Sequence, residues 1–195
     1  MNTRFNTRKL TTMRIMAGLS VALVFFIDFP IFPQASFLEY DPADIPILIV
    51  TFAYGPLAGL IVTAVTSIVQ GLTISAQSGV YGILMHILST GSYVLTAGII
   101  YRLKYNRSGA GIGLFCGVLA SAAVMAAANL VITPLFMGVP VEAVKSMLLP
   151  IIIPFNLIKA GTNGVVTFLL YNLLYKPISS LSADNNAADN EAYES

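Results

Sequence analysis

The stretch Pro150–Tyr175, PIIIPFNLIKAGTNGVVTFLLYNLLY, decides how this chain folds. It is long and apolar enough to cross a bilayer as a helix, for which about 20 residues are needed. Asn156, Lys159 and Asn163 nevertheless interrupt its middle. A lysine at the centre of a membrane costs about 2.5–3.5 kcal/mol even on lenient insertion scales. We therefore expect a membrane helix whose polar residues meet a buried partner or a water-filled cavity.

The composition of the whole chain indicates a membrane protein. Of its 195 residues, 56% are hydrophobic and 10% are charged, and the mean hydropathy is +0.81. Soluble domains carry about 25% charged residues, so a lipid bilayer is the expected surrounding. The single cysteine, Cys116, excludes an internal disulfide framework. The ten basic residues form no stripe with interleaved aromatic residues, which argues against nucleic-acid binding.

Six apolar segments predict an all-α bundle of six membrane helices. The second is too short to span a bilayer alone, and it leads into the third at Gly55-Pro56, where proline favours a helix start. The bundle is expected over residues 13–176, after a basic N-terminus (1–12) and before an acidic tail (177–195) that is expected to be disordered. The expected segments are Met13–Phe29, Ile45–Tyr54, Gly55–Ile74, Val80–Leu103, Gly109–Phe136 and Leu148–Tyr175.

The sequence predicts a multi-pass protein of the cell membrane, and its distribution of charge predicts that both termini face the cytoplasm. With six spans, eight basic residues fall on one side of the membrane, and cytoplasmic loops are the ones enriched in Lys and Arg. The other side holds four carboxylates and a single lysine. The basic residues are Arg4, Arg8, Lys9, Arg14, Arg102, Lys104, Arg107 and Lys176, and the residues opposite them are Glu39, Asp41, Asp44, Glu142 and Lys145.

Several catalytic and cofactor motifs are absent from the sequence. There is no G-x-x-x-x-G-K-[ST] for a nucleotide phosphate, no H-E-x-x-H and no G-x-S-x-G. The single histidine, His86, has no cysteine or second histidine with which to hold a metal. An intramembrane enzyme that uses Lys159 would need a second titrating group, which asparagines do not supply. We therefore expect a binding protein and not an enzyme, with a ligand-free membrane scaffold as a further alternative.

The polar residues of the last helix favour a ligand cavity over simple helix packing. Asn156, Lys159 and Asn163 follow i, i+3, i+7 spacing and share an arc of about 60°. Hydrogen bonds between helices explain an asparagine but not a lysine. Asn129, about seven residues before the outer end of its helix, lies at a depth where it could join the same cavity. Pro154 removes a backbone donor and is expected to loosen the preceding turn.

The outer loop FPQASFLEYDPADIP (Phe32–Pro46) has two readings. It is either an ordinary solvated acidic loop or a cap over the cavity, with Glu39 or Asp41 near Lys159. Three further polar residues are expected to be satisfied interior or interfacial groups, namely Asp28, Gln70 and His86.

Small residues mark two helix faces. Gly109, Gly113 and Gly117 recur every four residues, which favours close helix packing. Near the N-terminus, Ala17, Gly18 and Ala22 form another small face. That face could pack within the chain or dock onto a partner, and the sequence favours neither.

Four motifs resemble the riboflavin-specific substrate-binding (S) components of energy-coupling factor (ECF) vitamin transporters. The resemblance extends over Arg14–Lys176, in register with the six expected helices. The motifs are FLEYDPADIP (Phe37–Pro46), GPLAG (Gly55–Gly59), NLVITPLFMGVP (Asn129–Pro140) and PFNLIK (Pro154–Lys159).

The resemblance implies a six-helix membrane subunit that binds riboflavin near the extracellular side. It implies a transmembrane coupling (T) subunit and two cytoplasmic ATPase subunits as partners, with the small face of the first helix meeting the coupling subunit. The alternative cargo is another vitamin or a nucleoside-like solute. The implied substrate-binding residues are Asn129, Asn156, Lys159, Leu38, Tyr40 and Asp41, to which the helix spacing adds Asn163.

Overall fold

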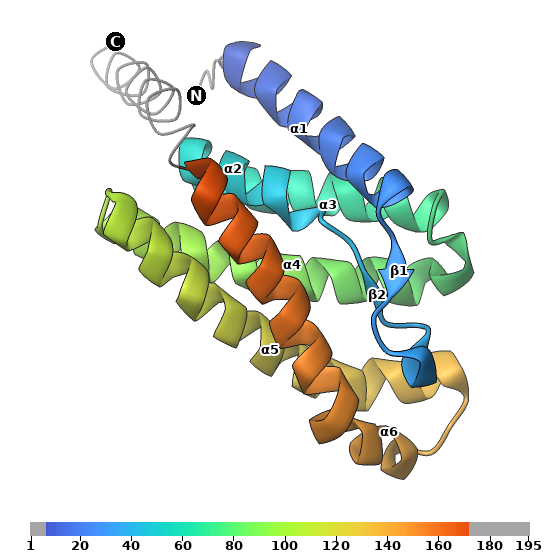
Figure 1. Ribbon diagram of the computed structural model, residues 1–195. Coiled ribbons are helices and arrows are strands. Elements are labelled where there is room, and N and C mark those ends of the chain that lie inside the picture. Colours follow the sequence, from blue (N-terminus) through green and yellow to red (C-terminus); the bar gives the residue numbers. More distant parts are fainter. Residues whose placement is uncertain (1–6, 172–195) are drawn as a thin grey trace, which may run out of the picture.

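Six helical segments make up the computed structural model, which describes residues 7–171 (Figure 1). They confirm the expected all-α membrane bundle. Four segments are long and apolar enough to cross a membrane, whereas α2 and α3 have 11 and 17 residues. The segments are α1 (Thr7–Phe26), α2 (Asp44–Tyr54), α3 (Pro56–Leu72), α4 (Gly79–Leu103), α5 (Arg107–Met137), and a last one over Val141–Tyr171.

The last segment begins earlier than the sequence suggested and contains an irregular turn. It starts with α6 (Val141–Met147), passes through a π-helical turn at Leu148–Ile152 and continues as helix 153–171. The π turn contains Pro150 and ends two residues before Pro154. Because proline has no N–H to donate, the regular hydrogen-bond ladder cannot continue there. The turn before Pro154 is thus loosened, as expected.

Other helix boundaries differ from expectation mainly at the first helix. α1 begins at Thr7 and not at Met13, so polar residues of the expected N-terminus already belong to the helix. The expected acidic tail (177–195) and the end of the last segment lie outside the described residues.

Gly55 separates α2 from α3, as the sequence predicted. Its φ of 90° suits glycine, and Pro56 then occupies the first turn of α3. A Cβ at Gly55 would overlap the guanidinium of Arg102, which therefore lies against this junction. The close contact joins the α2–α3 junction to the last turn of α4.

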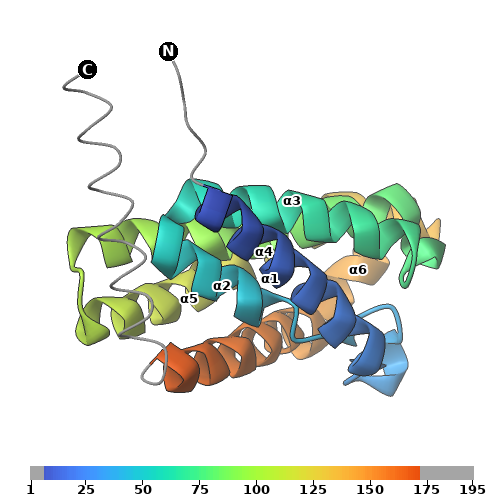
Figure 2. The same cartoon turned by 90° about the horizontal axis from the view of Figure 1, so that it is seen from above.

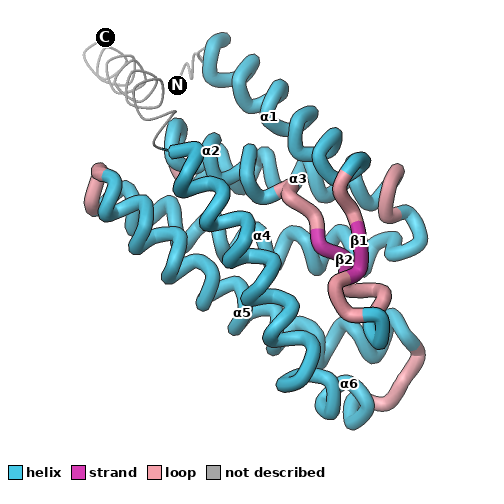
Figure 3. The backbone as a smooth tube through the Cα atoms, viewed as in Figure 1, coloured by secondary structure: helices cyan, strands magenta, loops and turns pink. Residues whose placement is uncertain are grey.

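A short hairpin lies between α1 and α2 (Figure 3). β1 (Phe29–Pro30) pairs antiparallel with β2 (Glu39–Tyr40), so that Phe29 is opposite Tyr40. We refer to residues 27–43 as the α1–α2 segment. Its Ala35 and Leu38 are buried in an apolar cluster with Val144, Ile152 and Phe155. This cluster packs the α1–α2 segment against the first half of the last helical segment, at one end of the bundle.

Tyr93 of α4 joins three helices in the core. Its hydroxyl donates to the carbonyl of Ala160 at 3.2 Å, and a Cβ at Gly117 or Gly164 would overlap the tyrosine side chain. A Cβ at Gly113 would meet the backbone of Ala97 in α4. The glycines of α5 therefore allow close helix packing, as their spacing predicted.

Six of the eight lysines and arginines in residues 7–171 gather at the end of the bundle opposite the α1–α2 segment: Arg8, Lys9, Arg14, Arg102, Lys104 and Arg107. There the Tyr54 hydroxyl donates to Thr12 at 3.3 Å, and the Arg107 guanidinium lies 5.3 Å from the centre of the Phe168 ring. The start of α1, the α4–α5 connection and the last described turn thus share one end. Which side of the membrane this end faces stays a prediction from the charge distribution.

Candidate functional site

A cavity lies between the α1–α2 segment, α3, α4, α5 and helix 153–171. It holds about 920 Å³ of empty space, including the part open to solvent. In Figure 2, α3 and helix 153–171 lie on opposite sides of the bundle, and residues of both helices line the cavity between them. Its polar lining includes Asp28, Glu39, Asp41, Ser67, Gln70, His86, Asn129, Thr133, Asn156 and Lys159, and its apolar lining includes Phe37, Leu38, Met85, Met125, Ile132, Phe136 and Phe155.

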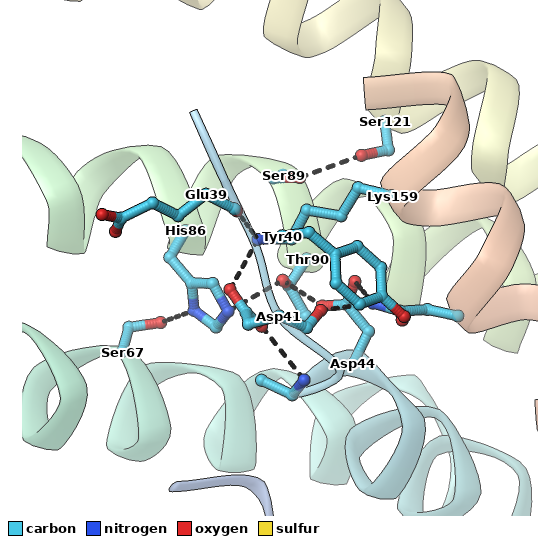
Figure 4. Close-up of polar contacts among 12 residues, drawn as sticks. Glu39, Tyr40, Asp41, Asp44, Ser67, His86, Ser89, Thr90, Ser121 and Lys159 are labelled. Carbon is cyan, nitrogen blue, oxygen red and sulfur yellow. Dashed lines mark hydrogen bonds and ion pairs between the residues drawn. The ribbon is translucent and has the colours of Figure 1, made fainter. Parts of the chain in front are cut away.

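Lys159 forms an ion pair with Asp41 across the cavity wall (Figure 4). Its Nζ lies 2.6 Å from Asp41 Oδ2 and also donates to the backbone carbonyl of Glu39 at 3.3 Å. Both side chains are largely buried, at 14% and 5% relative exposure. A buried charge is tolerated when it is paired and hydrogen-bonded. The sequence left open a buried partner or a water-filled cavity for this lysine, and one reading of the outer loop placed Glu39 or Asp41 near it. In the structure the partner is the Asp41 carboxylate.

The electrostatics of Asp41 favour its ionised form. Burial alone would raise the pKa of this carboxyl, but the Lys159 ammonium outweighs burial, with help from the backbone N–H of Ala43. The pKa of Asp41 is therefore lowered. Asp41 is thus the anionic member of a pair that joins the α1–α2 segment to helix 153–171.

Two other carboxylates of the α1–α2 segment lie near this pair. In Figure 4 the side chain of Glu39 extends away from Lys159, which it contacts through its backbone. Burial raises the pKa of Glu39, and the negative charge of Asp28 adds to the effect. Burial also raises the pKa of Asp28, followed by the charge of Asp41. Among residues 7–171, a single lysine, Lys159, lines the cavity beside these three acidic groups.

Asn163 anchors the α1–α2 segment and the start of α2. Its amide nitrogen donates to the Asp41 carbonyl at 3.0 Å and to the Asp44 carboxylate at 2.9 Å. Its oxygen accepts a hydrogen bond from the Tyr40 hydroxyl at 3.1 Å. Asn163 is fully buried and, like Tyr40, is not among the residues that line the cavity. Both residues therefore act on the cavity by holding its cover.

His86 belongs to a satisfied polar chain. Its Nδ1 is 2.7 Å from the Ser67 hydroxyl, and its Nε2 is 3.4 Å from that of Thr90. Thr90 in turn donates to Asp44 at 2.6 Å. Figure 4 shows the chain running from Ser67 through His86 and Thr90 to Asp44. The expectation of a satisfied interior histidine is confirmed.

Asn129 and Asn156 line the cavity with their side chains bonded to their own helices. Asn129 donates to the Met125 carbonyl at 2.8 Å and accepts from Thr133 at 2.8 Å. Asn156 donates to the Ile152 carbonyl at 2.8 Å, within the π turn. One N–H of each amide remains after these bonds, because an amide nitrogen carries two. Both side chains are held in place while a donor is kept for a ligand.

Gln70 and Asp28 behave differently from their expected roles. Gln70 Oε1 and Asp28 Oδ1 are buried, and neither accepts a hydrogen bond within residues 7–171. Both residues line the cavity. The sequence interpretation as satisfied polar groups was therefore wrong for these two. It failed because the donors available to a side chain depend on neighbouring helices, which the sequence does not reveal.

The small face of α1 divides between two surroundings. Ala17 is buried in the core of the bundle, whereas Gly18 is exposed and has no other atoms near its Cβ position. Ala22 is partly exposed. Ala17 therefore packs within the chain, and Gly18 with Ala22 remains the face open to a partner.

The predicted site residues separate into two groups. Five line the cavity together, and they come from the α1–α2 segment, α5 and helix 153–171. Tyr40 and Asn163 lie outside the lining. The five are Leu38, Asp41, Asn129, Asn156 and Lys159.

A family model described as the substrate-specific component of ECF transporters matches residues 8–171. The chain belongs to this family. Its similarity extends to a solved structure of the S component of a bacterial ECF transporter, at 30% identity and a TM-score of 0.76. That match covers 87% of this chain and 96% of the solved one.

Two relatives have similar lengths. The chain is 29% identical to the riboflavin transporter RibU of Staphylococcus aureus (strain TCH60) over 179 residues, which cover 89% of this chain and 91% of the relative. It is 26% identical to the riboflavin transporter FmnP of Bacillus subtilis (strain 168) over 176 residues, covering 86% and 90%.

Membership in this family settles the class of protein. The chain is the substrate-specific component of an ECF transporter, and so part of a larger assembly and not an enzyme. It is a multi-pass protein of the bacterial cell membrane, in agreement with its four apolar spanning helices. The cavity beneath the α1–α2 segment is where such a component can hold its substrate.

Proposed function

We propose that this S component binds riboflavin in the cavity from the extracellular side and mediates its uptake. The observation that carries the proposal is a cavity lined by Asn129, Asn156 and Lys159 in a chain whose relatives are named riboflavin transporters. Riboflavin has a flat tricyclic ring and a chain of hydroxyls. A ligand of this shape requires an apolar slot with a few polar groups that fix its orientation.

The lining offers both kinds of contact. Phe37, Phe136 and Phe155 supply apolar surface for a flat ring. Asn129 and Asn156 each keep an amide donor, and two of the three N–H bonds of Lys159 are already committed to Asp41 and Glu39. The third N–H of Lys159 is then available to a carbonyl or hydroxyl oxygen of the vitamin.

The neutral Lys159–Asp41 pair suits a neutral ligand. Riboflavin brings no charge with which to replace either partner, so the ion pair can stay intact while the vitamin is bound. Leu38, in the α1–α2 segment, lines the cavity and would add apolar surface for the ring. Tyr40 and Asn163 contribute by holding this segment in place.

The proposal includes the rest of the transporter. A transmembrane coupling (T) subunit would contact the exposed Gly18–Ala22 face of α1, and two cytoplasmic ATPase subunits would supply the energy. The basic end of the bundle, with both termini, would face the cytoplasm, where loops rich in Lys and Arg are usually found. Residues 1–12 and 177–195 would then be cytoplasmic extensions of the membrane domain.

The alternative proposal is the same class of subunit with a different cargo. Another vitamin or a nucleoside-like solute also combines a flat ring with hydroxyls, and the asparagines could orient it in a similar way. A thermal-shift panel of vitamins and nucleosides separates the two proposals, since the true cargo gives the largest increase in the unfolding temperature.

The direct test is to express the chain alone, purify it in mild detergent and record visible absorption and flavin fluorescence. A yellow preparation that releases about one riboflavin per chain on denaturation, or quenching of added riboflavin at that ratio, is the expected result. A colourless preparation that leaves the fluorescence of added riboflavin unchanged would contradict the proposal.

A further inference from the structure

The turn between α4 and α5 presents three basic side chains within six residues. It reads RLKYNR from Arg102 to Arg107, and Arg102, Lys104 and Arg107 are all exposed. The turn is tight, because the backbone N–H of Asn106 donates to the Lys104 carbonyl at 2.8 Å and a Cβ at Gly109 would overlap that carbonyl. The three positive charges are therefore confined to the adjoining ends of two helices.

Among residues 7–171, no carboxylate lies beside these charges. The acidic residues of this part of the chain lie in the α1–α2 segment, in the first turn of α2 and in α6, namely Asp28, Glu39, Asp41, Asp44 and Glu142. Like charges held close together repel one another, and an anion bound among them replaces the repulsion with attraction. The α4–α5 turn is thus suited to an anionic partner.

Contacts with the bundle hold two of the basic side chains in place. The Arg102 guanidinium lies against Gly55 at the α2–α3 junction. The Arg107 guanidinium lies 5.3 Å from the centre of the Phe168 ring, in the last helix. A side chain that is already ordered loses less freedom when it binds, so the turn is partly preorganised for its partner.

Exposed apolar side chains alternate with the basic ones. Leu103 is 82% exposed and Tyr105 is 45% exposed, and they flank Lys104 on either side in the sequence. A free phosphate ion gains nothing from apolar surface, whereas a phospholipid combines a phosphate with acyl chains. Tyrosine is also enriched at the level of the lipid headgroups. The alternation therefore fits an anion that is amphipathic.

We propose that the α4–α5 turn is a binding site for an anionic phospholipid. Arg102, Lys104 and Arg107 contact its phosphate, and Leu103 and Tyr105 contact its acyl chains. Because α4 and α5 are both long and apolar enough to cross the membrane, the turn that joins them lies at a membrane surface. In the predicted orientation this is the cytoplasmic surface, whose leaflet is rich in anionic lipids. The inference goes beyond the proposed function and does not depend on the cargo.

The test measures phospholipid binding to the full chain in detergent by native mass spectrometry. Dioleoylphosphatidylglycerol is the anionic probe, and dioleoylphosphatidylcholine is the probe without net charge. At about 0.15 M salt, charges interact over about 8 Å, so distant basic residues contribute little. Phosphatidylglycerol should bind at least about tenfold more tightly than phosphatidylcholine. Equal binding of the two lipids would overturn the proposal.

A pair of double variants separates this site from the general positive charge of the same end. Arg102→Gln with Lys104→Gln should weaken phosphatidylglycerol binding about 30-fold, or about fivefold for each charge. The matched control is Lys9→Gln with Arg14→Gln, which removes one lysine and one arginine from α1 at the same end. The control should lose less than about threefold. Equal losses in the two double variants would overturn the site.

The unfolding temperature without added lipid shows whether each variant is folded. If the double variant of the turn does not fold, the single variants Arg102→Gln and Lys104→Gln take its place. Each should lose about fivefold in phosphatidylglycerol affinity. Unchanged affinity in both single variants would overturn the proposal.

Two further measurements identify the anion. An excess of inorganic phosphate should not displace phosphatidylglycerol, and displacement would mean a site for free anions and overturn the lipid. The acidic tail, which lies outside the described residues, is the competing occupant. Neutralising its carboxylates should leave phosphatidylglycerol binding unchanged, whereas binding seen only in that variant would mean that the tail occupies the turn. The neutralised variant carries Asp184→Asn, Asp189→Asn, Glu191→Gln and Glu194→Gln.

Discussion

Lys159 has two roles that substitution can separate, because it both faces the cavity and balances Asp41. Lys159→Met should weaken riboflavin binding and also destabilise the protein by about 3–5 kcal/mol, since a buried carboxylate is left without its partner. The double variant Lys159→Met with Asp41→Asn should recover most of the stability but not the affinity. Thermal unfolding and fluorescence titration of the three proteins measure both effects.

Recovery of affinity together with stability in the double variant would show that Lys159 acts only through Asp41. The single variant Asp41→Asn is the matched control, because it keeps the ammonium while removing the carboxylate. Its riboflavin affinity should stay closer to that of the wild type than that of Lys159→Met.

At the scale of single residues the sequence revealed the costly residues, but it offered Glu39 or Asp41 as neighbours of Lys159 in only one of two readings of the outer loop. Lys159, Asn129 and Asn156 were predictable because polar groups in a membrane helix require an explanation. Asn163 follows the same spacing, yet it contacts Asp41 and Asp44 and not the cavity. The three polar residues of the last helix share an arc of about 60°, which is wide enough for Asn156 and Lys159 to line the cavity while Asn163 contacts the α1–α2 segment beside it. Gln70 was missed for the related reason that its lack of a donor is a tertiary property.

The α1–α2 segment is the element that depends most on a few hydrogen bonds. Asn163→Ala removes its bonds to Asp41, Tyr40 and Asp44, so the segment should open more often and the protein should lose about 1–3 kcal/mol of stability. Hydrogen exchange of residues 38–43 should become faster, and bound riboflavin should dissociate faster.

Thr167→Val is the control for this prediction, because the Thr167 hydroxyl contacts only the carbonyl of Asn163 within its own helix among the described residues. Thr167→Val should leave the rate of hydrogen exchange in residues 38–43 and the rate of riboflavin dissociation near those of the wild type. Wild-type exchange in Asn163→Ala would mean that the apolar cluster of Ala35 and Leu38 holds the segment by itself.

Element boundaries were predictable where apolar runs end at glycine or proline. The α2–α3 junction at Gly55-Pro56 is an example. The start of the last segment was not predictable from hydropathy, because Val141–Met147 includes Glu142, Lys145 and Ser146 and resembles a loop. This turn becomes helical because it continues into the membrane helix and buries Val144 against the α1–α2 segment.

The orientation of the whole molecule can be measured with two single cysteines in a Cys116→Ser background. Gln77→Cys lies between α3 and α4, and Ser108→Cys lies at the start of α5, where basic residues gather. Both positions are exposed. A membrane-impermeant maleimide should label Gln77→Cys on intact cells, but Ser108→Cys only after permeabilisation. The reverse pattern would place the termini outside and overturn the predicted orientation.

The ion pair between Lys159 and Asp41 has a consequence for how the membrane potential acts on the molecule. One elementary charge that crosses 100 mV exchanges about 2.3 kcal/mol with the field. The two opposite charges lie 2.6 Å apart, so they move together and the field does almost no net work on them. Any movement of this site across the membrane is then insensitive to voltage as far as the pair is concerned. A variant that keeps Asp41 and lacks Lys159 would couple the same movement to the voltage.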